Sequence, residues 1–379
     1  MRPTPGDDAL PVADHVFIPL KDQRSMETFL PDLSTREAWK RLAEREAQGS
    51  RAKFWRSVPS LPPRPDDAHK GTFGTALLVG GSRGMAGAIG LAGAAAVVAG
   101  AGLTRLCVPD PILETVAGYD REYTTITCPS DAQGRFSDAA LDAILDAAAS
   151  ASAVGIGPGL GRSPALDRIV AELFFELTQP AVFDADALNA LASAGVFGPD
   201  AGKAYVGRVP KGARVLTPHP GEFKRLAGFM PSDDRDDRKE ASETFFKNYV
   251  AAYYGRTLNV DKSRLRPTTL LLKGHDTVVT ELRFPSAGGH RIAQSINFTG
   301  NSNLATGGSG DVLTGLVVGL AAQGAPAADA ARIAAALHGE ASELRWTLCK
   351  RGATAGDIVR FIPPAFDYYM RATRACEAE

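Results

Sequence analysis

Cysteine and net charge are both scarce in this chain, and their scarcity argues against several classes of protein. The 379 residues include only four cysteines, which are far apart and form no C-x-x-C pair: Cys107, Cys128, Cys349 and Cys376. A zinc site or a disulfide framework is therefore not expected, and reduced thiols in the cytoplasm are the simpler interpretation. The formal net charge of −1 shows none of the basic excess that is typical of nucleic-acid-binding domains.

Targeting and membrane segments are not evident either. Residues 1–20 carry acidic residues and prolines without an apolar core, so no signal peptide is expected. Residues 84–104 contain no charged residue and are long enough to span a bilayer. Glycine and alanine dominate this stretch, however, and bulky apolar residues are few. We therefore expect a helix buried against a sheet, no membrane association, and a cytoplasmic protein.

Two common phosphate-binding motifs are missing from the sequence. No G-x-x-x-x-G-K-[ST] motif occurs, so a P-loop nucleotide hydrolase is not expected. The segment V-G-G-S-R-G-M-A-G-A at residues 79–88 is similar to a dinucleotide fingerprint but lacks the G-x-G-x-x-G spacing. A nucleotide site in this chain therefore has to be built in another way.

What the sequence does contain is an alternation of short apolar runs with longer helical segments. The runs lie at residues 75–79, 103–108, 153–156, 181–183, 214–216 and 269–272. This pattern predicts an α/β fold, a three-layer α/β/α arrangement with a central, mostly parallel sheet. Ligands bind such sheets beyond the carboxyl ends of the strands, which is where the polar and Gly-rich turns of this sequence fall.

The first 66 residues differ from the rest and are expected to form an N-terminal arm. Residues 34–56 predict a polar helix that opens with the capping sequence S-T-R-E, and S-L-P-P-R-P at residues 60–65 predicts a connector. The catalytic domain is expected to occupy residues 67–379. Packing or oligomer contact is the simplest role for the arm.

The strongest motif is G-G-S-G-D at residues 307–311, directly before an apolar helical pattern. Its glycines allow close approach of the backbone, and the free N–H groups of a helix N-terminus favour a phosphoryl group. Asp311 either caps the helix or acts as a base that takes a proton from a substrate hydroxyl. We favour the base, because a carboxylate beside a phosphate is repelled unless it has a function.

Two other strand ends carry polar side chains. In L-T-P-H-P-G-E, two prolines fix a turn around His219, and a structural and a ligand-binding role are both open. Glu222 in this motif either caps the next helix or holds a water molecule or a metal. In F-D-A-D-A-L-N, Asp184 and Asp186 either share a Mg²⁺, bind a ribose or hydroxyl, or cap the following helix.

Two turns complete the set of strand-end motifs. The glycine-rich G-I-G-P-G-L-G at residues 155–161 predicts close approach by a ligand or by another backbone segment. The sequence L-K-G-H-D-T at residues 272–277 places Lys273 at a strand end, where it either binds nucleotide phosphates or lies on the surface.

In this order, the motifs resemble those of the ADP/ATP-dependent NAD(P)H-hydrate dehydratase family of the ribokinase-like superfamily. The resemblance extends from about residue 68 to residue 364 and includes K-G-T-F-G, G-P-G-L-G, D-A-D-A-L-N, T-P-H-P-G-E and N-S-N-L-A-T-G-G-S-G-D-V-L. It implies a ribokinase-like fold without a large lid. It also implies an enzyme that phosphorylates the ring hydroxyl of the S epimer of NADHX or NADPHX from ADP or ATP. Elimination of the phosphate would then restore NAD(P)H.

The resemblance further implies roles for individual residues. Asp311 would contact the substrate hydroxyl beside an anion hole made by Gly308, Ser309 and Gly310. Substrate-binding positions would be Ala88, Gly159, Asp186, Asn189 and His219. The nucleotide would be bound by Lys273, Gly274, His275, Asp276 and Thr277 together with Gly310. Mg²⁺ is implied with the nucleotide, with Asp184 and Glu222 as weak metal candidates, and relatives of this kind are often homotetramers.

The chain departs from the family pattern in three places. Asn303-Leu304 stands where Gly-Met is usual, and His275 stands where L-K-G-A has alanine; we expect both to alter affinity more than chemistry. The arm is too short for the epimerase domain that the family often carries, so no epimerase activity is expected.

Two alternative hypotheses follow from the same motifs. A small-molecule kinase of this fold would use the same anion hole and the same base on a vitamin precursor or sugar hydroxyl. A non-catalytic nucleotide-binding protein would have lost the aspartate or the glycine turn, and both are intact here. The sequence does not decide between ADP and ATP or between NADHX and NADPHX. It assigns no function to the charged segment at residues 231–266.

Overall fold

The computed structural model describes residues 54–55, 57–197, 205, 208–253, 265–285, 289–348 and 350–377. Residues 49–379 form one compact unit, and residues 1–48 are a separate unit that lies outside the described residues. Most of the polar helix that the sequence predicts at residues 34–56 therefore also lies outside them, as does Cys349.

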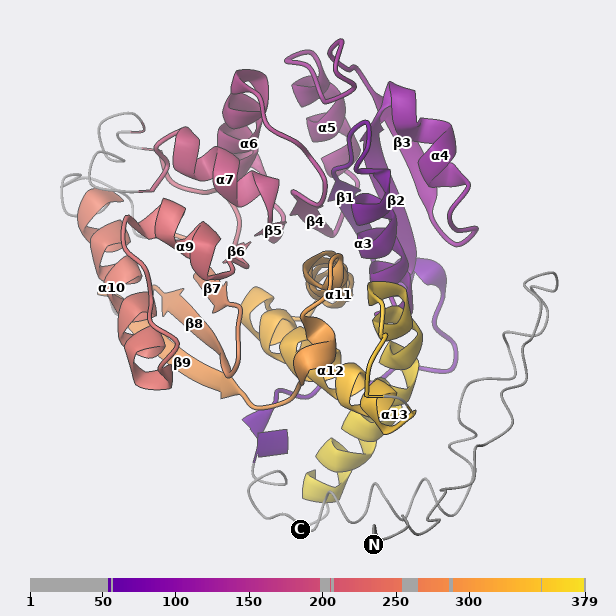
Figure 1. Cartoon of the computed structure of the whole chain (residues 1–379), viewed down its shortest axis with the longest axis vertical. Coiled ribbons are helices and arrows are strands. Elements are labelled where there is room, and N and C mark those ends of the chain that lie inside the picture. Colours follow the sequence, from indigo (N-terminus) through magenta and orange to yellow (C-terminus); the bar gives the residue numbers. More distant parts are fainter. Residues whose placement is uncertain are drawn as a thin grey trace, which may run out of the picture. The chain divides into compact units, whose positions relative to one another are not determined.

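Nine strands of the described residues form one sheet, in the order β3-β2-β1-β4-β5-β6-β7-β8-β9 (Figure 1). All neighbours from β3 to β7 are parallel, whereas β7–β8 and β8–β9 are antiparallel. The predicted α/β fold with a mostly parallel sheet is confirmed. The strands are β1 (Thr75–Val79), β2 (Leu103–Pro109), β3 (Thr124–Cys128), β4 (Ala153–Ile156), β5 (Ala181–Phe183), β6 (Arg214–Leu216), β7 (Thr268–Leu272), β8 (Thr277–Arg283) and β9 (Arg291–Asn297).

The register of the central strands brings the predicted motifs to one edge of the sheet. Val79 pairs with Ile156, Ile156 with Phe183, and Phe183 with Leu216. Each of these four residues is the last of its strand. The turns that follow β1, β4, β5 and β6 therefore emerge side by side, which is the placement expected for a ligand site in a parallel sheet.

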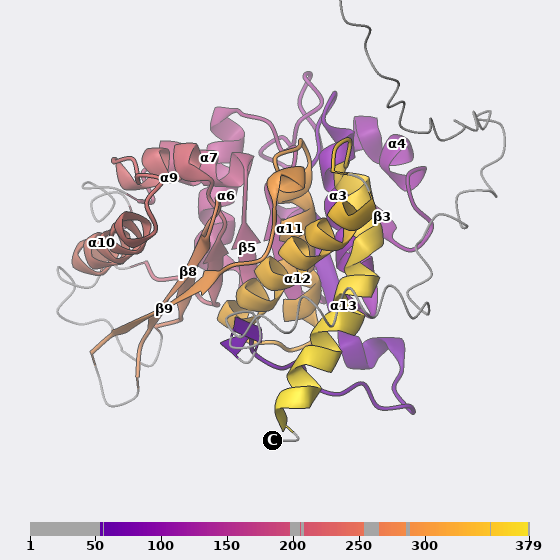
Figure 2. The same ribbon diagram turned by 60° about the horizontal axis from the view of Figure 1, so that its bottom comes forward.

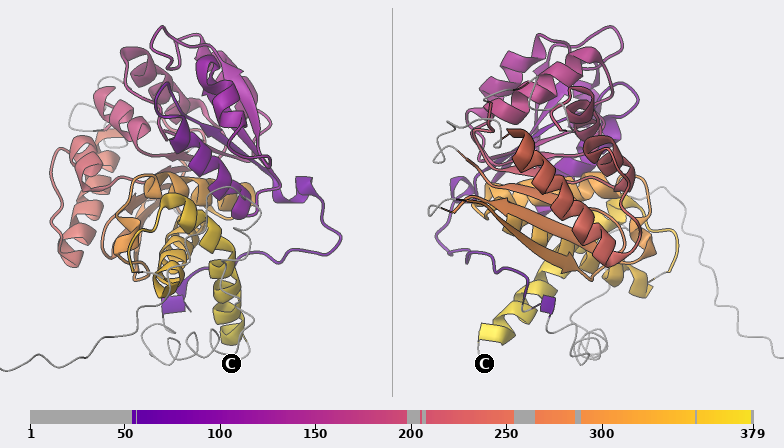
Figure 3. Two further views of the ribbon diagram at one scale, coloured as in Figure 1. Left: turned by 45° about the vertical axis from the view of Figure 1, so that its right-hand side comes forward. Right: turned by 90° about the vertical axis from the view of Figure 1, so that its left-hand side faces the viewer.

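Helices cover both faces of the sheet (Figures 2 and 3). One face carries α3 (Ala86–Val98), α11 (Ser309–Ala322) and α12 (Ala327–Leu348), with α13 (Ala355–Glu377) packed on these helices. The other face carries α5 (Ala140–Ala148), α6 (Pro164–Glu176), α7 (Asp186–Ser193), α9 (Pro220–Ala227) and α10 (Arg235–Tyr253). The short α4 (Leu113–Ala117) lies beside β3 and α3, and 3-10 turns occur at Lys70–Phe73, Asp110–Ile112 and Ser302–Leu304.

Small residues in α3 and α11 let these two helices pack closely, which explains the uncharged stretch at residues 84–104. A Cβ atom at Gly315 would lie 2.1 Å from the carbonyl oxygen of Ala92, and one at Gly319 would lie 2.7 Å from the Cβ of Ala99. The expected buried helix is confirmed, and none of the described helices is long and apolar enough to cross a membrane. The close contact also fixes where the N-terminus of α11 points.

The residues just before the predicted catalytic domain pack against it. Trp55 is buried and its ring contacts those of Tyr368 and Tyr369. In the Pro-rich segment, which has no regular secondary structure, Arg64 donates to the carbonyl of Gly100 at 3.0 Å and to Gln323 at 2.9 Å. Residues 60–65 are therefore held on the domain surface.

Candidate active site

Helix α11 begins at the glycine turn, and its first residues settle one of the open interpretations of Asp311. The N-cap is Gly308, with a φ of 86° that favours glycine, and no side chain caps the helix. Asp311 is the third residue of the helix, so the interpretation as an N-cap is wrong. The turn therefore presents backbone N–H groups and a carboxylate at the same helix end.

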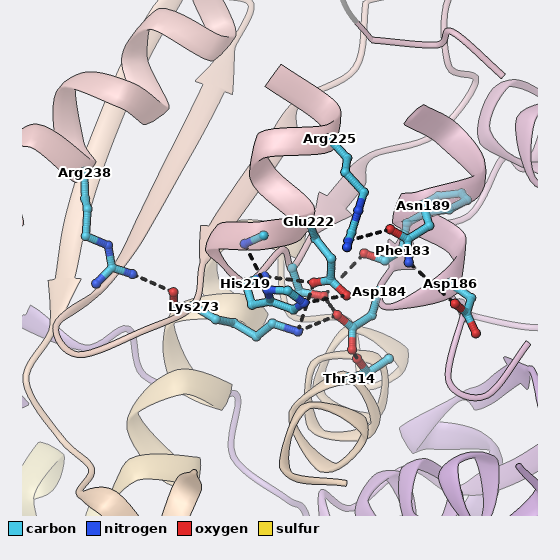
Figure 4. Close-up of polar contacts among 12 residues, drawn as sticks. Phe183, Asp184, Asp186, Asn189, His219, Glu222, Arg225, Arg238, Lys273 and Thr314 are labelled. Carbon is cyan, nitrogen blue, oxygen red and sulfur yellow. Dashed lines mark hydrogen bonds and ion pairs between the residues drawn. The ribbon is translucent and has the colours of Figure 1, made fainter. Parts of the chain in front are cut away.

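A buried polar cluster lies beneath this helix end (Figure 4). Asp184 is 1% exposed. Its Oδ1 accepts from Lys273 Nζ at 2.7 Å and from Thr217 Oγ1 at 2.8 Å. Its Oδ2 accepts from Thr314 Oγ1 at 2.8 Å. The residue thus joins the ends of β5, β6 and β7 to α11 through one carboxylate, and the buried negative charge is paired.

Lys273 places its ammonium group beside the glycine turn. A Cβ atom at Gly310 would lie 3.3 Å from Lys273 Nζ and 3.6 Å from Asp184 Oδ2. Burial alone would lower the pKa of Lys273, but the charges of Asp184 and Glu222 raise it, so the amine stays protonated. A cation and the free N–H groups of α11 therefore meet at one point, which suits an anion.

Asp311 is half-buried beside this cluster and accepts no hydrogen bond from the described residues. Burial, and after it the negative charge of Asp184, raise the pKa of Asp311 to about 7, while Lys273 opposes the shift. A carboxylate with this pKa is present in both forms near neutral pH, which is the property required of a general base.

The T-P-H-P-G-E turn is a capping box. His219 is the N-cap of α9, its Nδ1 accepts from the N–H of Gly221 at 3.0 Å, and Glu222 Oε2 accepts from the N–H of His219 at 2.9 Å. Because Nδ1 is an acceptor, the proton of the neutral ring is assigned to Nε2, which faces Glu222 Oε1 at 3.4 Å. The ring remains about half exposed and can also meet a ligand.

The two aspartates of D-A-D-A-L-N have different partners, and neither is the N-cap of α7. Asp186 Oδ2 accepts from the N–H of Gly161 at 2.9 Å and thereby ties α7 to the G-P-G-L-G turn. Asn189 Oδ1 accepts from Arg225 of α9 at 2.9 Å (Figure 4).

The other predicted positions fall into two places. A Cβ atom at Gly159 would lie 3.0 Å from the Cβ of Ala88, so these two substrate candidates are neighbours. In the turn after β7, Lys273 points into the buried cluster, while the side chain of His275 is 97% exposed.

Three polar residues that support this site were not predicted from the sequence. Thr217 and Thr314 bind Asp184, and buried His338 of α12 lies with its Nε2 3.3 Å from Ser309 Oγ. Burial and the charge of Lys273 lower the pKa of His338 to about 4, so this ring is neutral. Thr314 lies one helical turn after Asp311, and this spacing could have identified it from the sequence. No sequence pattern marks His338.

The metal candidates do not form a Mg²⁺ cage. The described residues contain no group of three or more His, Cys, Asp or Glu side chains arranged to hold a metal ion. The oxygens of Asp184 are occupied by Lys273 and two threonines, and Glu222 serves the capping box. Both carboxylates therefore accept hydrogen bonds from protein groups in this structure.

Comparison with known sequences gives one consistent family. A model of NAD(P)H-hydrate dehydratase matches residues 76–364. The bifunctional NAD(P)H-hydrate repair enzyme of Moorella thermoacetica is 40% identical over 304 residues, which cover 80% of this chain and 51% of that protein. The ADP-dependent (S)-NAD(P)H-hydrate dehydratase of Neisseria meningitidis is 35% identical over 310 residues, covering 80% of this chain and 86% of that protein.

Solved structures agree with this result. The ADP/ATP-dependent NAD(P)H-hydrate dehydratase from Bacillus subtilis, co-crystallized with ATP/Mg²⁺, has a TM-score of 0.60 and 27% identity, covering 84% of this chain and 97% of that one. A ribokinase-like superfamily protein from Enterococcus faecalis, 22% identical, has the same TM-score of 0.60 over 84% of this chain and 94% of its own, and shows the fold. This chain spans about half the length of the bifunctional relatives, 51% of the Moorella protein and 54% of the one from Salinibacter ruber.

Proposed function

Because this chain belongs to the NAD(P)H-hydrate dehydratase family, we propose that it catalyses the ADP- or ATP-dependent dehydration of the S epimer of NADHX or NADPHX. The alignment with the Neisseria relative, which is named for this reaction with ADP, covers 86% of that protein, and this supports the assignment. The observation that carries the proposal is the position of Asp311, with its raised pKa, at the same helix end as Gly310 and Lys273.

The reaction consists of two steps. In the first, the substrate hydroxyl oxygen attacks the terminal phosphorus of the nucleotide, the bond to the leaving phosphate oxygen breaks, and Asp311 takes the hydroxyl proton. In the second, the C–O bond of the new phosphate ester breaks, inorganic phosphate leaves with the electron pair of that bond, and the neighbouring ring carbon loses a proton. The ring double bond forms, and the products are NAD(P)H, inorganic phosphate and a nucleotide shortened by one phosphate.

The residues of this chain supply positioning and charge for the first step. The N–H groups of Gly308 and Gly310 are proposed to bind the transferred phosphoryl group, whereas the N–H of Ser309 donates to the carbonyl of Thr306 at 3.3 Å. The ammonium of Lys273 adds positive charge beside Gly310, while Asp184 holds that ammonium in place. Burial, and after it repulsion from Asp184, raise the pKa of Asp311 and so keep it basic enough to accept the hydroxyl proton.

The substrate is proposed to lie along the neighbouring strand-end turns. Ala88 and Gly159 offer a small-residue surface against which a flat ring can pack, and both lie at the same sheet edge as the base. Asp186 and Asn189 lie in α7, which follows β5, and His219 caps α9, which follows β6; we propose that these three residues provide polar contacts. We propose that Mg²⁺ enters with the nucleotide phosphates, since the carboxylates beside the turn are already engaged.

We also propose a cellular location and an oligomeric state for this protein. A cytoplasmic location agrees with the free, buried thiols of Cys107 and Cys128. A homotetramer is proposed for the working enzyme; light scattering on the purified chain at assay concentration tests it, and a monomer that is fully active would contradict it.

A direct assay tests the proposed activity. Purified protein is mixed with hydrated NADH, Mg²⁺ and either ADP or ATP, and the absorbance of reduced nicotinamide is followed. A nucleotide-dependent rise is expected, and comparison of the two nucleotides identifies the donor. No rise in a folded protein that binds one of them would contradict the proposal and favour a kinase of the same fold, to be sought with a panel of hydroxyl substrates.

A further inference from the structure

Helix α10 sends one buried arginine to the turn between β7 and β8. Arg238 is 3% exposed, and its Nη2 donates to the carbonyls of Leu272 at 3.1 Å and Lys273 at 2.6 Å. Its Nη1 donates to the carbonyl of His275. Figure 4 shows the side chain reaching from α10 to the backbone of Lys273. One guanidinium group therefore binds the last carbonyl of β7 and two carbonyls of the predicted nucleotide-binding turn.

The same turn is fixed at two more points. Gly274 has a φ of 148°, and a Cβ atom there would lie 2.4 Å from Arg238 Nη2, so glycine is required for the guanidinium to approach. The carbonyl of Gly274 accepts from Thr277 Oγ1 at 3.0 Å. Asp276, with a φ of 54°, accepts from Arg235 at 3.0 Å and 2.7 Å.

These contacts separate the donors of the turn from its acceptors. All four carbonyls from Leu272 to His275 accept from side chains, and the N–H of Lys273 donates to the carbonyl of Pro218 at 2.9 Å. By contrast, the N–H groups of Gly274, His275 and Asp276 donate to no residue that the structure describes. Consecutive free N–H groups favour an anion, and the charge of Arg238 behind them strengthens that preference.

Burying Arg238 in this way is costly for the fold. Its hydrogen bonds go to neutral carbonyls, and its Nε has no partner among the described residues. A buried cation and an unpaired buried donor both oppose folding. Packing alone does not account for this arginine, because an apolar side chain of the same volume would fill the space without these costs. We therefore look for its role in the turn whose carbonyls it binds.

We propose that Arg238 is a positioning residue for the phosphoryl donor: by holding the carbonyls of Leu272, Lys273 and His275, it presents the N–H groups of this turn to the nucleotide phosphates. The inference rests on the proposed function, because the nucleotide is the ligand of the turn. It adds α10 to the residues that determine nucleotide affinity.

The chain provides a matched control in Arg214. This arginine is also fully buried, and it donates to the carbonyls of Phe174, Leu177, Gln179 and Ala213. It is the first residue of β6 and therefore lies at the amino end of the strand, away from the carboxyl ends where the ligand-site turns emerge. Replacing either arginine by lysine keeps the charge and removes the planar fork that binds several carbonyls.

The test compares Arg238→Lys with Arg214→Lys in the full chain. The dissociation constant of ADP and of ATP is measured by titration calorimetry, and hydrogen exchange is followed in residues 273–277. We expect Arg238→Lys to weaken nucleotide binding by about tenfold or more, since several hydrogen bonds to a charged group are lost. Exchange becomes faster at the N–H of Lys273, which donates to the carbonyl of Pro218, while kcat at saturating nucleotide changes by less than about threefold. Arg214→Lys lowers the melting temperature but leaves both nucleotide constants within about twofold.

The outcomes separate this inference from the proposed function. If Arg238→Lys loses stability yet binds ADP and ATP as Arg214→Lys does, the positioning role is overturned and the proposed function stands. If Arg238→Lys weakens binding but the wild-type protein forms no NADH, the positioning role stands and the proposed function fails. A wild-type protein that binds neither nucleotide overturns both. Should Arg238→Lys not fold, Asp276→Asn, which removes the Arg235 contact at the surface, is expected to weaken nucleotide binding by about threefold; unchanged binding there overturns the proposal.

Discussion

Lys273 and Asp184 form a 2.7 Å ion pair directly beneath the glycine turn that begins α11. The two residues come from different strand ends, and Thr314 connects the same carboxylate to α11. The pair places a cation beside the proposed phosphoryl position, and the charge of Asp184 adds to the effect of burial in raising the pKa of Asp311. The predictions below follow from this arrangement.

Asp311→Asn should remove the base and keep the anion site. We expect kcat to fall by about 10²–10⁴-fold, the usual contribution of a positioned base, while the dissociation constant of ADP stays within about threefold. Stopped assays of NADH formation and calorimetry with ADP measure the two quantities. A variant with near wild-type turnover would remove Asp311 from the reaction.

The pH dependence of the wild-type enzyme should report the same carboxylate. Because burial and Asp184 raise the pKa of Asp311 to about 7, kcat/KM should fall about tenfold for each pH unit below that value and level off above it. The profile is measured at subsaturating substrate, with separate controls for substrate stability. A limb centred near the ordinary aspartate pKa of about 4 would contradict the assignment.

Stability should depend on pH in the opposite sense. A carboxyl group whose pKa is raised on folding stabilises the protein below its unfolded pKa, and this stabilisation is lost as pH rises through about 7. Asp311→Asn should therefore unfold at a higher temperature than wild type at pH 8, by roughly 2 °C, with a smaller difference at pH 5. An equal difference at both pH values would show that the native pKa of Asp311 is not raised.

The Lys273–Asp184 pair should behave as one unit. Lys273→Met leaves a buried carboxylate without its cation and is expected to cost about 3 kcal/mol of unfolding free energy, whereas the double variant with Asp184→Asn should recover much of that loss. Lys273→Met should also raise the nucleotide KM more than it lowers kcat at saturation. Additive losses in urea unfolding, or an unchanged nucleotide KM, would argue against the pair.

Gly310→Ala should affect the anion site more than the fold. The added methyl group would lie 3.3 Å from Lys273 Nζ, at the position proposed for the phosphoryl group. Gly356→Ala is a matched control, since Gly356 is likewise the second residue of its helix and its Cβ would meet only Thr354 Oγ1 at 3.7 Å. Both changes favour the helix by about 1 kcal/mol, but only Gly310→Ala should reduce kcat/KM, by about tenfold or more. Equal activity of the two variants would contradict this placement.

Much of the fold was predictable because the central strands are short, apolar and followed by Gly-rich or polar turns. Runs such as T-A-L-L-V and A-V-G-I are buried on both faces, so their pattern is unambiguous. The strands β3, β8 and β9 were not predicted, because they mix polar with apolar residues. Strands β3 and β9 are the two edge strands of the sheet, and their Thr124 and Arg291 are exposed, while β8 lies between β7 and β9.

The site was predictable only where one motif contained it. The proposed anion site and Asp311 lie within the single motif at residues 307–311, so local sequence was sufficient to suggest them. The partner of Lys273 was not, because Asp184 is 89 residues away and meets it only through strand pairing. Arg238 and His338 lie on helices whose sequences carry no local signal, and the packing of α10 and α12 alone brings them to the site.

One stoichiometric measurement tests the central claim most directly. Purified (S)-NADHX is incubated with the enzyme and with its preferred nucleotide, and NADH, inorganic phosphate and the shortened nucleotide are quantified from the same samples. We predict one phosphate and one shortened nucleotide for every NADH formed, and none of the three with Asp311→Asn. NADH formed without nucleotide consumption, or nucleotide consumed to give a stable phosphorylated product without NADH, would contradict the claim.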